Sequence, residues 1–149
     1  MGKFTISGGS DFIKVTLEKV FGFPDTTCFW GGYDVQARIE IKSGNFGVKS
    51  GLWISTGELH DFFQQLNHSY LSLTGDVSLN SYEGNLNLIA AFDGLGHVNI
   101  TGSFSEQNEF ANDLKFEFVS DQTFIRSTLC ELEQIVLKYG DAKGINHTN

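Results

Sequence analysis

Length, composition and charge define the broad class of this protein. The chain has 149 residues and a formal net charge of −8, and its 40% hydrophobic and 19% charged residues are typical of a globular protein rather than a disordered one. Its ten Lys and Arg residues are scattered along the sequence, whereas binding of DNA or RNA needs clustered cations. These values exclude a disordered chain and argue against a direct nucleic-acid partner.

The N-terminal segment and the cysteines indicate the compartment. The first residues, MGKFTISGGSDF, lack the apolar region of a secretory signal, and no apolar run approaches the roughly 20 residues that span a membrane. Cys28 and Cys130 are too far apart in the sequence to form a metal-type pair. We therefore expect a cytoplasmic protein without a membrane partner.

Alternation of apolar and polar residues predicts strands along most of the chain. It runs through FIKVTLEKVF and then through YDVQARIEIK. In the latter, the inward-facing residues are Val35, Ala37, Ile39 and Ile41. A turn at 43–45 leads into FGVKSGLWI, and a turn at 93–96 joins NLNLIAAF to HVNITGSF; both contain the Gly, Asn or Asp that hairpins need. With DLKFEFV near the end, we expect about eight strands.

Two amphipathic helices interrupt the strands. The first begins in STGELHDFFQQLNHS, where Ser55 and Glu58 have the spacing of a capping box. The second is expected to begin at Asp121, a good N-cap residue, and to end at Tyr139, before Gly140. Each has an apolar stripe, formed by Leu59, Phe62, Phe63 and Leu66 in the first helix and by Ile125, Leu129, Leu132, Val136 and Tyr139 in the second.

Together these elements predict an α+β fold. Clean alternation favours antiparallel strands with one wet face, because parallel strands are usually buried on both faces. We therefore expect a curved, mostly antiparallel sheet of about eight strands, or a partly closed barrel, with two helices packed on its apolar face. Residues 1–140 are expected to form this single domain, and residues 141–149 to form a frayed tail.

No segment of the sequence has a catalytic or metal-binding signature. GNFGVKSG lacks the spacing of a phosphate-binding loop, and a strand follows it instead of a helix. His60 and Asp61 supply two ligands where a metal site needs three or four. Cys28 is the better candidate for a reactive thiol, because Cys130 is expected to be half-buried on the second helix. We predict no catalytic residue, no metal and no cofactor, and thus a protein that is not an enzyme.

The stretch CFWGGYD, residues 28–34, places three aromatic residues, a thiol and a carboxylate around two glycines. Gly31 and Gly32 are expected to form a flexible joint before the next strand. Phe29 is expected in the core. Trp30 remains as a candidate anchor for a protein–protein interface, in which Trp is enriched at hot spots.

A pattern of hydrophobic residues and glycines extends along nearly the whole chain. It comprises the Tyr33-Asp34 entry to a long alternating strand, GNFGVKSGLWI running into ELHDFFQQL, the hairpin YEGNLNLIAAFDGLGHVNITGSF, and LKFEFVSDQTFI with its Asp121-Gln122-Thr123 helix start. In this pattern the chain resembles the WapI-type immunity proteins, which are small bacterial proteins encoded beside secreted or contact-delivered toxins. The resemblance implies that the protein binds and neutralises a cognate toxin, a nuclease-type C-terminal domain, in the producing cell.

Acidic and aromatic residues are the candidates for the contact with such a toxin. A nuclease has a positive cleft for phosphate, so an acidic protein would be steered towards it in a salt-sensitive way. Carboxylates on the wet face of the sheet or at hairpin tips would form the patch. The candidate contact residues are Trp30, Asp34, Glu40, Tyr82, Glu83 and Asp93.

Two other functions remain open at this point. A small-molecule-binding β-rich domain would need a pocket of more than about 300 Å³. An enzyme would need catalytic residues that come together only in the fold. Edge strands and the aromatic loop also leave homodimer formation open.

Overall fold

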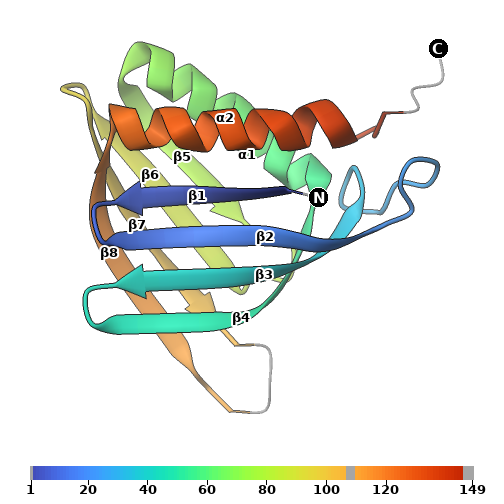
Figure 1. Ribbon diagram of the computed structural model, residues 1–149, viewed down its shortest axis with the longest axis horizontal. Coiled ribbons are helices and arrows are strands. Elements are labelled where there is room, and N and C mark those ends of the chain that lie inside the picture. Colours follow the sequence, from blue (N-terminus) through green and yellow to red (C-terminus); the bar gives the residue numbers. More distant parts are fainter. Residues whose placement is uncertain (1, 107–109, 146–149) are drawn as a thin grey trace.

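The computed structural model of the protein describes residues 2–106 and 110–145. Their strands form two four-stranded antiparallel sheets, and in each sheet every strand pairs with its neighbours in sequence (Figure 1). The N-terminal sheet contains β1 (Gly2–Gly8), β2 (Asp11–Phe21), β3 (Asp34–Ser43) and β4 (Phe46–Ser55). The C-terminal sheet contains β5 (Thr74–Asn80), β6 (Leu86–Asp93), β7 (His97–Ser105) and β8 (Asp113–Asp121). The helices are α1 (Thr56–Ser72) and α2 (Gln122–Tyr139).

The predicted α+β class is confirmed, as are the eight antiparallel strands and the two helices. The strands are divided between two sheets, whereas a single curved sheet or a partly closed barrel was expected. The reason is α1, which leads the chain from β4 in one sheet to β5 in the other, so that these two strands do not pair. The sheets of the described chain therefore do not close into a barrel.

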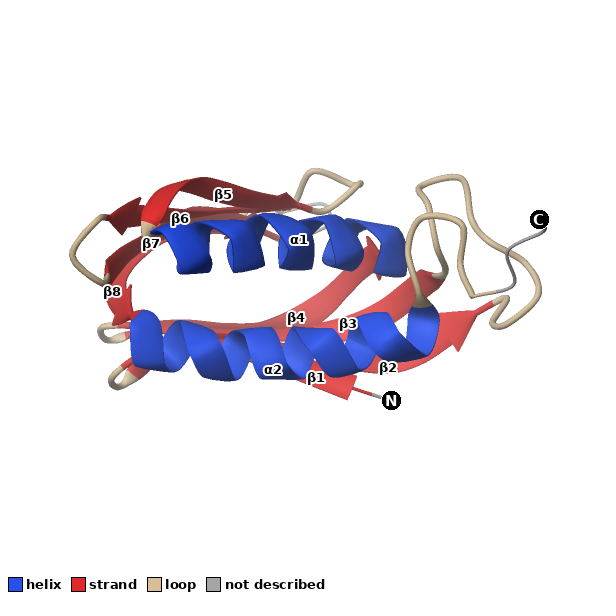
Figure 2. Ribbon diagram, turned by 90° about the horizontal axis from the view of Figure 1, so that it is seen from above, coloured by secondary structure: helices blue, strands red, loops and turns tan. Residues whose placement is uncertain are grey.

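The core lies between the two sheets and under the two helices. Figure 2 shows the sheets as two layers, with α1 and α2 side by side along the border where β5 and β1 lie. The predicted alternation in β3 is confirmed, because its four inward-facing residues are all buried: Val35, Ala37, Ile39 and Ile41. Most of the predicted helix stripes are buried as well, with Ile135 in place of Val136 in α2. The core is thus filled by the residues that the alternation of the strands and the 3.6-residue period of the helices turn inwards.

Both predicted helix caps are present. The Ser55 hydroxyl accepts a hydrogen bond from the Glu58 N–H at 3.1 Å, and the Ser55 N–H donates to the Glu58 carboxylate at 2.9 Å. The Asp121 carboxylate accepts from the Phe124 N–H at 3.0 Å. These bonds satisfy donors that have no partner within the helix, and so fix where each helix begins.

Side chains of α2 cover the outer edge of β1. Glu131 accepts a hydrogen bond from the Thr5 N–H at 2.9 Å and pairs with Lys3 at 2.8 Å. Thr128 donates to the Thr5 carbonyl at 2.6 Å. An uncovered edge strand presents free backbone groups to other chains, and α2 removes that exposure at Thr5.

The two sheets meet at a corner where β8 crosses the end of β1. Ser120 donates a hydrogen bond to the Ser7 carbonyl at 2.6 Å, and a Cβ on Gly8 would lie 2.2 Å from the carbonyl oxygen of Val119. Gly8 is therefore required by the close approach of the two backbones.

The corner gives the first prediction. Gly8→Ala places a methyl group against the β8 backbone, and we expect it to lower the free energy of unfolding by about 1–3 kcal/mol or more, as overpacking does. Urea denaturation monitored by circular dichroism measures the loss. Gly51→Ala is the matched control, since Gly51 lies in β4 of the same sheet and a Cβ there meets no atom within 4 Å. Equal stability of the two variants would contradict the role of the corner.

Candidate functional site

The candidate site lies at one end of the molecule, which we call the aromatic end. It consists of the β2–β3 loop (residues 22–33), the β5–β6 loop (residues 81–85) and the first turn of α1. The β2–β3 loop is drawn at the right of Figure 1, near the C-terminal end of α2. Four of the six candidate contact residues lie in or next to these segments: Trp30, Asp34, Tyr82 and Glu83.

Backbone groups of the β2–β3 loop satisfy the free donors of α1. The Gly31 carbonyl accepts from the Gly57 N–H at 3.1 Å, and the Tyr33 carbonyl accepts from the Thr56 N–H at 2.9 Å. The Tyr33 N–H in turn donates to the Thr56 hydroxyl at 2.7 Å. The helix start and the loop therefore hold each other in place.

Gly31 and Gly32 form a tight contact in place of the flexible joint that was expected. Both have a positive φ, of 96° and 67°, which side chains with a Cβ rarely adopt. A Cβ on Gly32 would lie 2.2 Å from the Thr56 hydroxyl oxygen, and a Cβ on Gly57 would lie 2.6 Å from the Gly31 carbonyl. Close packing of loop and helix explains the glycines on both sides.

Tyr33 is the core aromatic residue of this loop. Its ring is buried and contacts Phe23 edge to face at a centroid distance of 5.2 Å. Its hydroxyl donates to the Pro24 carbonyl at 2.8 Å and accepts from the Ile145 N–H at 3.1 Å. We expected a frayed tail at 141–149; residues 141–145 instead contact this loop, and 146–149 lie outside the described residues.

Phe29 and Trp30 project outwards from the loop. They are the central residues of a turn closed by the hydrogen bond from the Gly31 N–H to the Cys28 carbonyl, at 3.2 Å. The Phe29 side chain is 91% exposed, so its predicted place in the core is wrong, because Tyr33 occupies that place. Trp30 is 50% exposed and stacks on Tyr82, with ring centroids 5.0 Å apart and an interplanar angle of 4°.

Three acidic residues, Asp34, Glu58 and Glu83, lie near Tyr82. The Tyr82 hydroxyl donates to Asp34 at 2.8 Å, and Glu83 is the next residue in the chain. Burial raises the pKa of Tyr82, as do the hydrogen bond to Asp34 and the charges of Asp34 and Glu83. Burial also raises the pKa of Glu58, and the charge of Asp34 adds to that rise, while hydrogen bonds with Ser55 oppose it. The aromatic end thus has a concentrated negative charge.

The other two candidate residues lie elsewhere. Glu40 is in β3, 3.8 Å from the ammonium of Lys49 on β4. Asp93 lies in the β6–β7 hairpin, where it accepts from the Leu95 N–H at 2.7 Å and contacts the His97 ring at 3.0 Å. The hydrogen bond from Leu95, followed by those from His97, lowers the pKa of Asp93. This hairpin contacts the start of α2, through the hydrogen bond from the Gln122 N–H to the Gly96 carbonyl. The 18 residues of α2 span roughly 27 Å, and the aromatic end lies near the other end of this helix.

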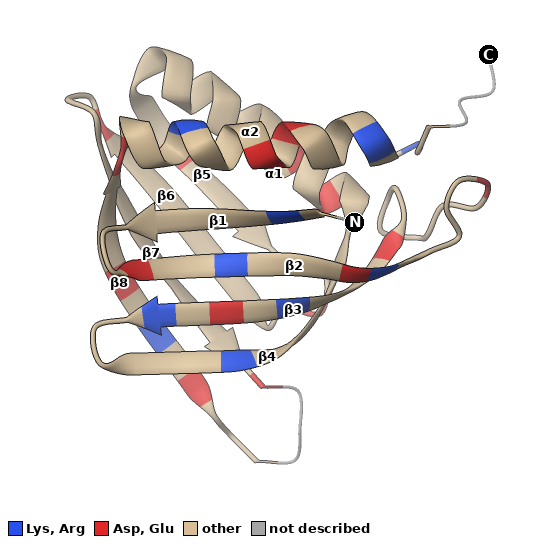
Figure 3. Cartoon of the chain, viewed as in Figure 1, with Lys and Arg blue, Asp and Glu red and all other residues tan. Residues whose placement is uncertain are grey.

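The fold concentrates the cations that are scattered in the sequence. Six of the ten Lys and Arg residues lie in the N-terminal sheet, as Figure 3 shows: Lys3, Lys14, Lys19, Arg38, Lys42 and Lys49. The strands of this sheet also carry Asp11, Glu18, Asp34 and Glu40, so cations and carboxylates are interspersed there. An acidic patch was expected partly on the wet face of the sheet, whereas the strands of the N-terminal sheet carry six cations beside four carboxylates. Of the acidic candidates, Glu83 lies in a loop, Asp34 and Glu40 lie in β3, and Asp93 ends β6.

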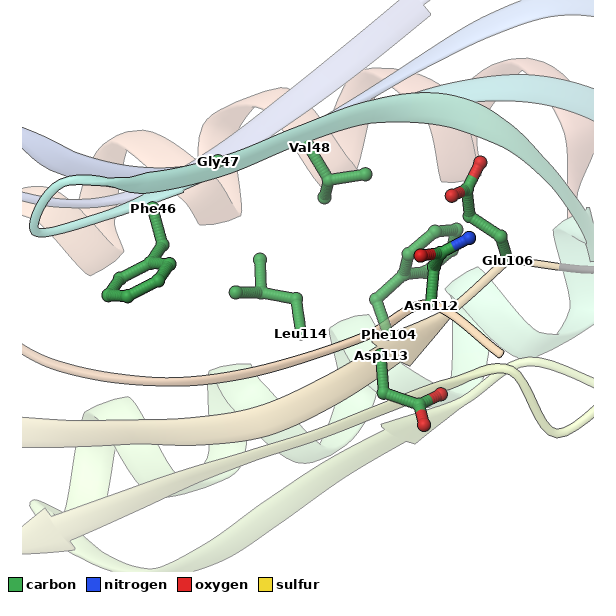
Figure 4. A pocket seen from close by; sticks show the side chains of 8 residues that line it. All are labelled: Phe46, Gly47, Val48, Phe104, Glu106, Asn112, Asp113 and Leu114. Carbon is green, nitrogen blue, oxygen red and sulfur yellow. The ribbon is translucent and has the colours of Figure 1, made fainter. Parts of the chain in front are cut away.

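A surface hollow of about 310 Å³ lies between the start of β4 and the strands β7 and β8 (Figure 4). It is lined by Phe46, Gly47, Val48, Phe104, Glu106, Asn112, Asp113 and Leu114. Its volume is at the lower limit for small-molecule sites, and its lining includes the buried Phe104 together with Val48 and Leu114, which pack against the core. It is separate from the aromatic end.

Both cysteines of the described chain are free thiols. Cys28 is half-buried, and its thiol lies 3.7 Å from the Gly31 carbonyl. Cys130 is exposed, so its predicted half-burial is wrong; the apolar stripe of α2 passes through its neighbour Leu129. Within residues 2–106 and 110–145, no group of three or more His, Cys, Asp or Glu could hold a metal ion. Neither described helix is long and apolar enough to cross a membrane.

Two antiparallel meanders, two helices along their border and an exposed aromatic end place this protein in the class of small α+β proteins. The chain belongs to the WapI-like immunity protein family, whose sequence profile matches residues 3–140. The resemblance found in the sequence is thereby confirmed. Membership of an immunity protein family implies binding of a cognate toxin. Neither the curated proteins nor the solved structures contain a match to this chain.

The raised pKa of Glu58 predicts a pH dependence of stability. A carboxyl whose pKa is higher in the folded state contributes stability that is complete below its ordinary pKa of 4.5 and is lost as the pH rises through the folded value. Glu58→Gln removes this titration and keeps a residue that suits the capping box. We expect the free energy of unfolding of the wild type, relative to the variant, to fall as the pH rises from ~4 to ~7.

Urea denaturation at several pH values tests this expectation. Glu133→Gln is the control, since Glu133 is exposed on α2 and lies far in the sequence from the segments that form the aromatic end. A constant difference between wild type and Glu58→Gln over the whole pH range would contradict it.

Proposed function

We propose that the protein neutralises a cognate bacterial toxin in the cytoplasm by binding it without covalent chemistry. Membership of the WapI-like immunity family over residues 3–140 supports the toxin as partner. The observation that favours the aromatic end as the contact is the pair of exposed aromatic side chains, Phe29 and Trp30, on a loop that is fixed to α1. Interfaces are enriched in such aromatic residues.

The charge of the protein favours a basic toxin, of which a nuclease-type C-terminal domain is the example that the family resemblance suggests. The net charge of −8 attracts a positively charged partner over a distance and speeds its encounter with the protein. A nuclease needs a positive surface to bind phosphate. Blocking that surface by a tight complex would stop the toxin without any reaction.

Co-expression tests the proposed function. The C-terminal domain of the toxin encoded beside this protein is expressed in a bacterial host, with and without the protein. We expect growth to stop with the toxin domain alone and to be restored by the wild-type protein. The toxin domain of an unrelated system serves as a control for specificity. Continued arrest in the presence of a folded, soluble wild-type protein would contradict the proposal.

The stoichiometry of neutralisation separates a binding protein from an enzyme. We expect toxin activity to fall linearly with added protein and to vanish at a fixed molar ratio, independent of the incubation time, because each complex blocks one toxin. A titration of purified toxin domain with the protein measures this ratio. Progressive inactivation of excess toxin by a small amount of protein would show catalysis instead.

A further inference from the structure

We infer that the aromatic end receives a cationic side chain, Arg or Lys, from the basic surface of its protein partner. This inference rests on the proposed function and names the chemistry that the interface recognises. The receiving groups are the rings of Phe29, Trp30 and Tyr82 and the carboxylates beside them.

The first argument is the exposure of the rings. Phe29 is 91% and Trp30 is 50% exposed, although burial of an aromatic side chain removes 150–250 Å² from water. The ring of Phe29 contacts Trp30 edge to face at 5.0 Å and leaves most of its own surface open. Phe29 contributes little to the fold, and both side chains leave ring surface that a partner can cover.

The second argument is that the surface is already ordered. The turn that bears Phe29 and Trp30 is closed by its own hydrogen bond, and its next residue, Gly31, is bound to Gly57 of α1. Trp30 rests on Tyr82, and Tyr82 is held by Asp34 at 2.8 Å. A partner would therefore lose little entropy in ordering this surface, which favours affinity.

The third argument is negative charge without a counter-ion. Within the described chain, none of Asp34, Glu58 and Glu83 forms an ion pair with Lys, Arg or His. Of the other two acidic candidates, Glu40 pairs with Lys49, and Asp93 accepts hydrogen bonds from Leu95 and His97 of its own hairpin. An unpaired group of carboxylates beside electron-rich rings is complementary to a cation.

Arg and Lys fit both parts of the surface at once. The face of an aromatic ring attracts a cation by its quadrupole, and a carboxylate adds a charge-assisted hydrogen bond. A guanidinium can stack on a ring and bind a carboxylate with its edge, and for this reason Arg is favoured at protein interfaces.

Aromatic substitutions test the location of the interface. The dissociation constant for the purified cognate toxin domain is measured by calorimetry for the wild type, Phe29→Ala and Trp30→Ala. We expect Trp30→Ala to raise it about 30-fold or more, as for a hot-spot residue. Phe46→Ala is the matched control, because Phe46 is 72% exposed but lies in the β3–β4 hairpin. Circular dichroism shows whether each variant is folded, and the exposure of Phe29 makes Phe29→Ala the variant that is safest for the fold.

Charge substitutions test whether the bound side chain is a cation. The association rate with the toxin domain is measured against ionic strength for the wild type and for the double variant Asp34→Asn and Glu83→Gln. Asn can still accept the hydrogen bond from Tyr82. We expect a loss of about tenfold at low salt that disappears at high salt, because salt screens the attraction. Glu117→Gln on β8 is the control for the loss of a carboxylate elsewhere.

The outcomes separate this inference from the proposed function. If the wild type binds the toxin and the aromatic and charge variants bind equally well, the inference is overturned while the proposed function stands. A loss of affinity in the aromatic variants without any effect of the charge variants would overturn the inference that the bound side chain is a cation. If the wild type neither binds nor protects, the proposed function itself fails.

Discussion

The first turn of α1 needs partners for its free N–H groups, and the loop between β2 and β3 provides them. Gly31 and Tyr33 accept from Gly57 and Thr56 in a contact so close that a Cβ on Gly32 would clash. Because α1 also leads the chain from one sheet to the other, this contact fixes the end of the sandwich and the position of the exposed rings. One requirement of helix geometry thus determines both the architecture and the candidate interface.

The fold distributes the charges of this protein unevenly. Six cations that are far apart in the sequence lie on the N-terminal sheet beside four carboxylates. At the aromatic end, Asp34, Glu58 and Glu83 lie near Tyr82, and none of them forms an ion pair with a cation of the described chain. The net charge of −8 therefore describes the whole chain but neither surface. A basic partner would be attracted most strongly where carboxylates lack a counter-ion, and this supplies orientation as well as attraction.

Local patterns predicted the elements well, because they arise from neighbours in the sequence. The alternation in β3 and the caps at Ser55 and Asp121 were readable for this reason. Phe29 and Tyr33 could not be told apart, since the choice between core and solvent depends on α1, more than 20 residues away. The stacking of Trp30 on Tyr82 joins two separate loops, and no local signal marks it. The division into two sheets did leave a signal, the helix between the fourth and fifth strands.

The meander order of both sheets has a consequence for how the molecule assembles. Every strand pairs with its sequence neighbour, so each half can form its ladder from local contacts, which close at small entropic cost. The halves are joined by contacts between residues more than 110 positions apart, such as Ser120 with Ser7 and Thr128 with Thr5. We expect the strands of each half to form early in folding and the two halves to dock late. The contact between β1 and α2 would then form last in folding and break first in unfolding.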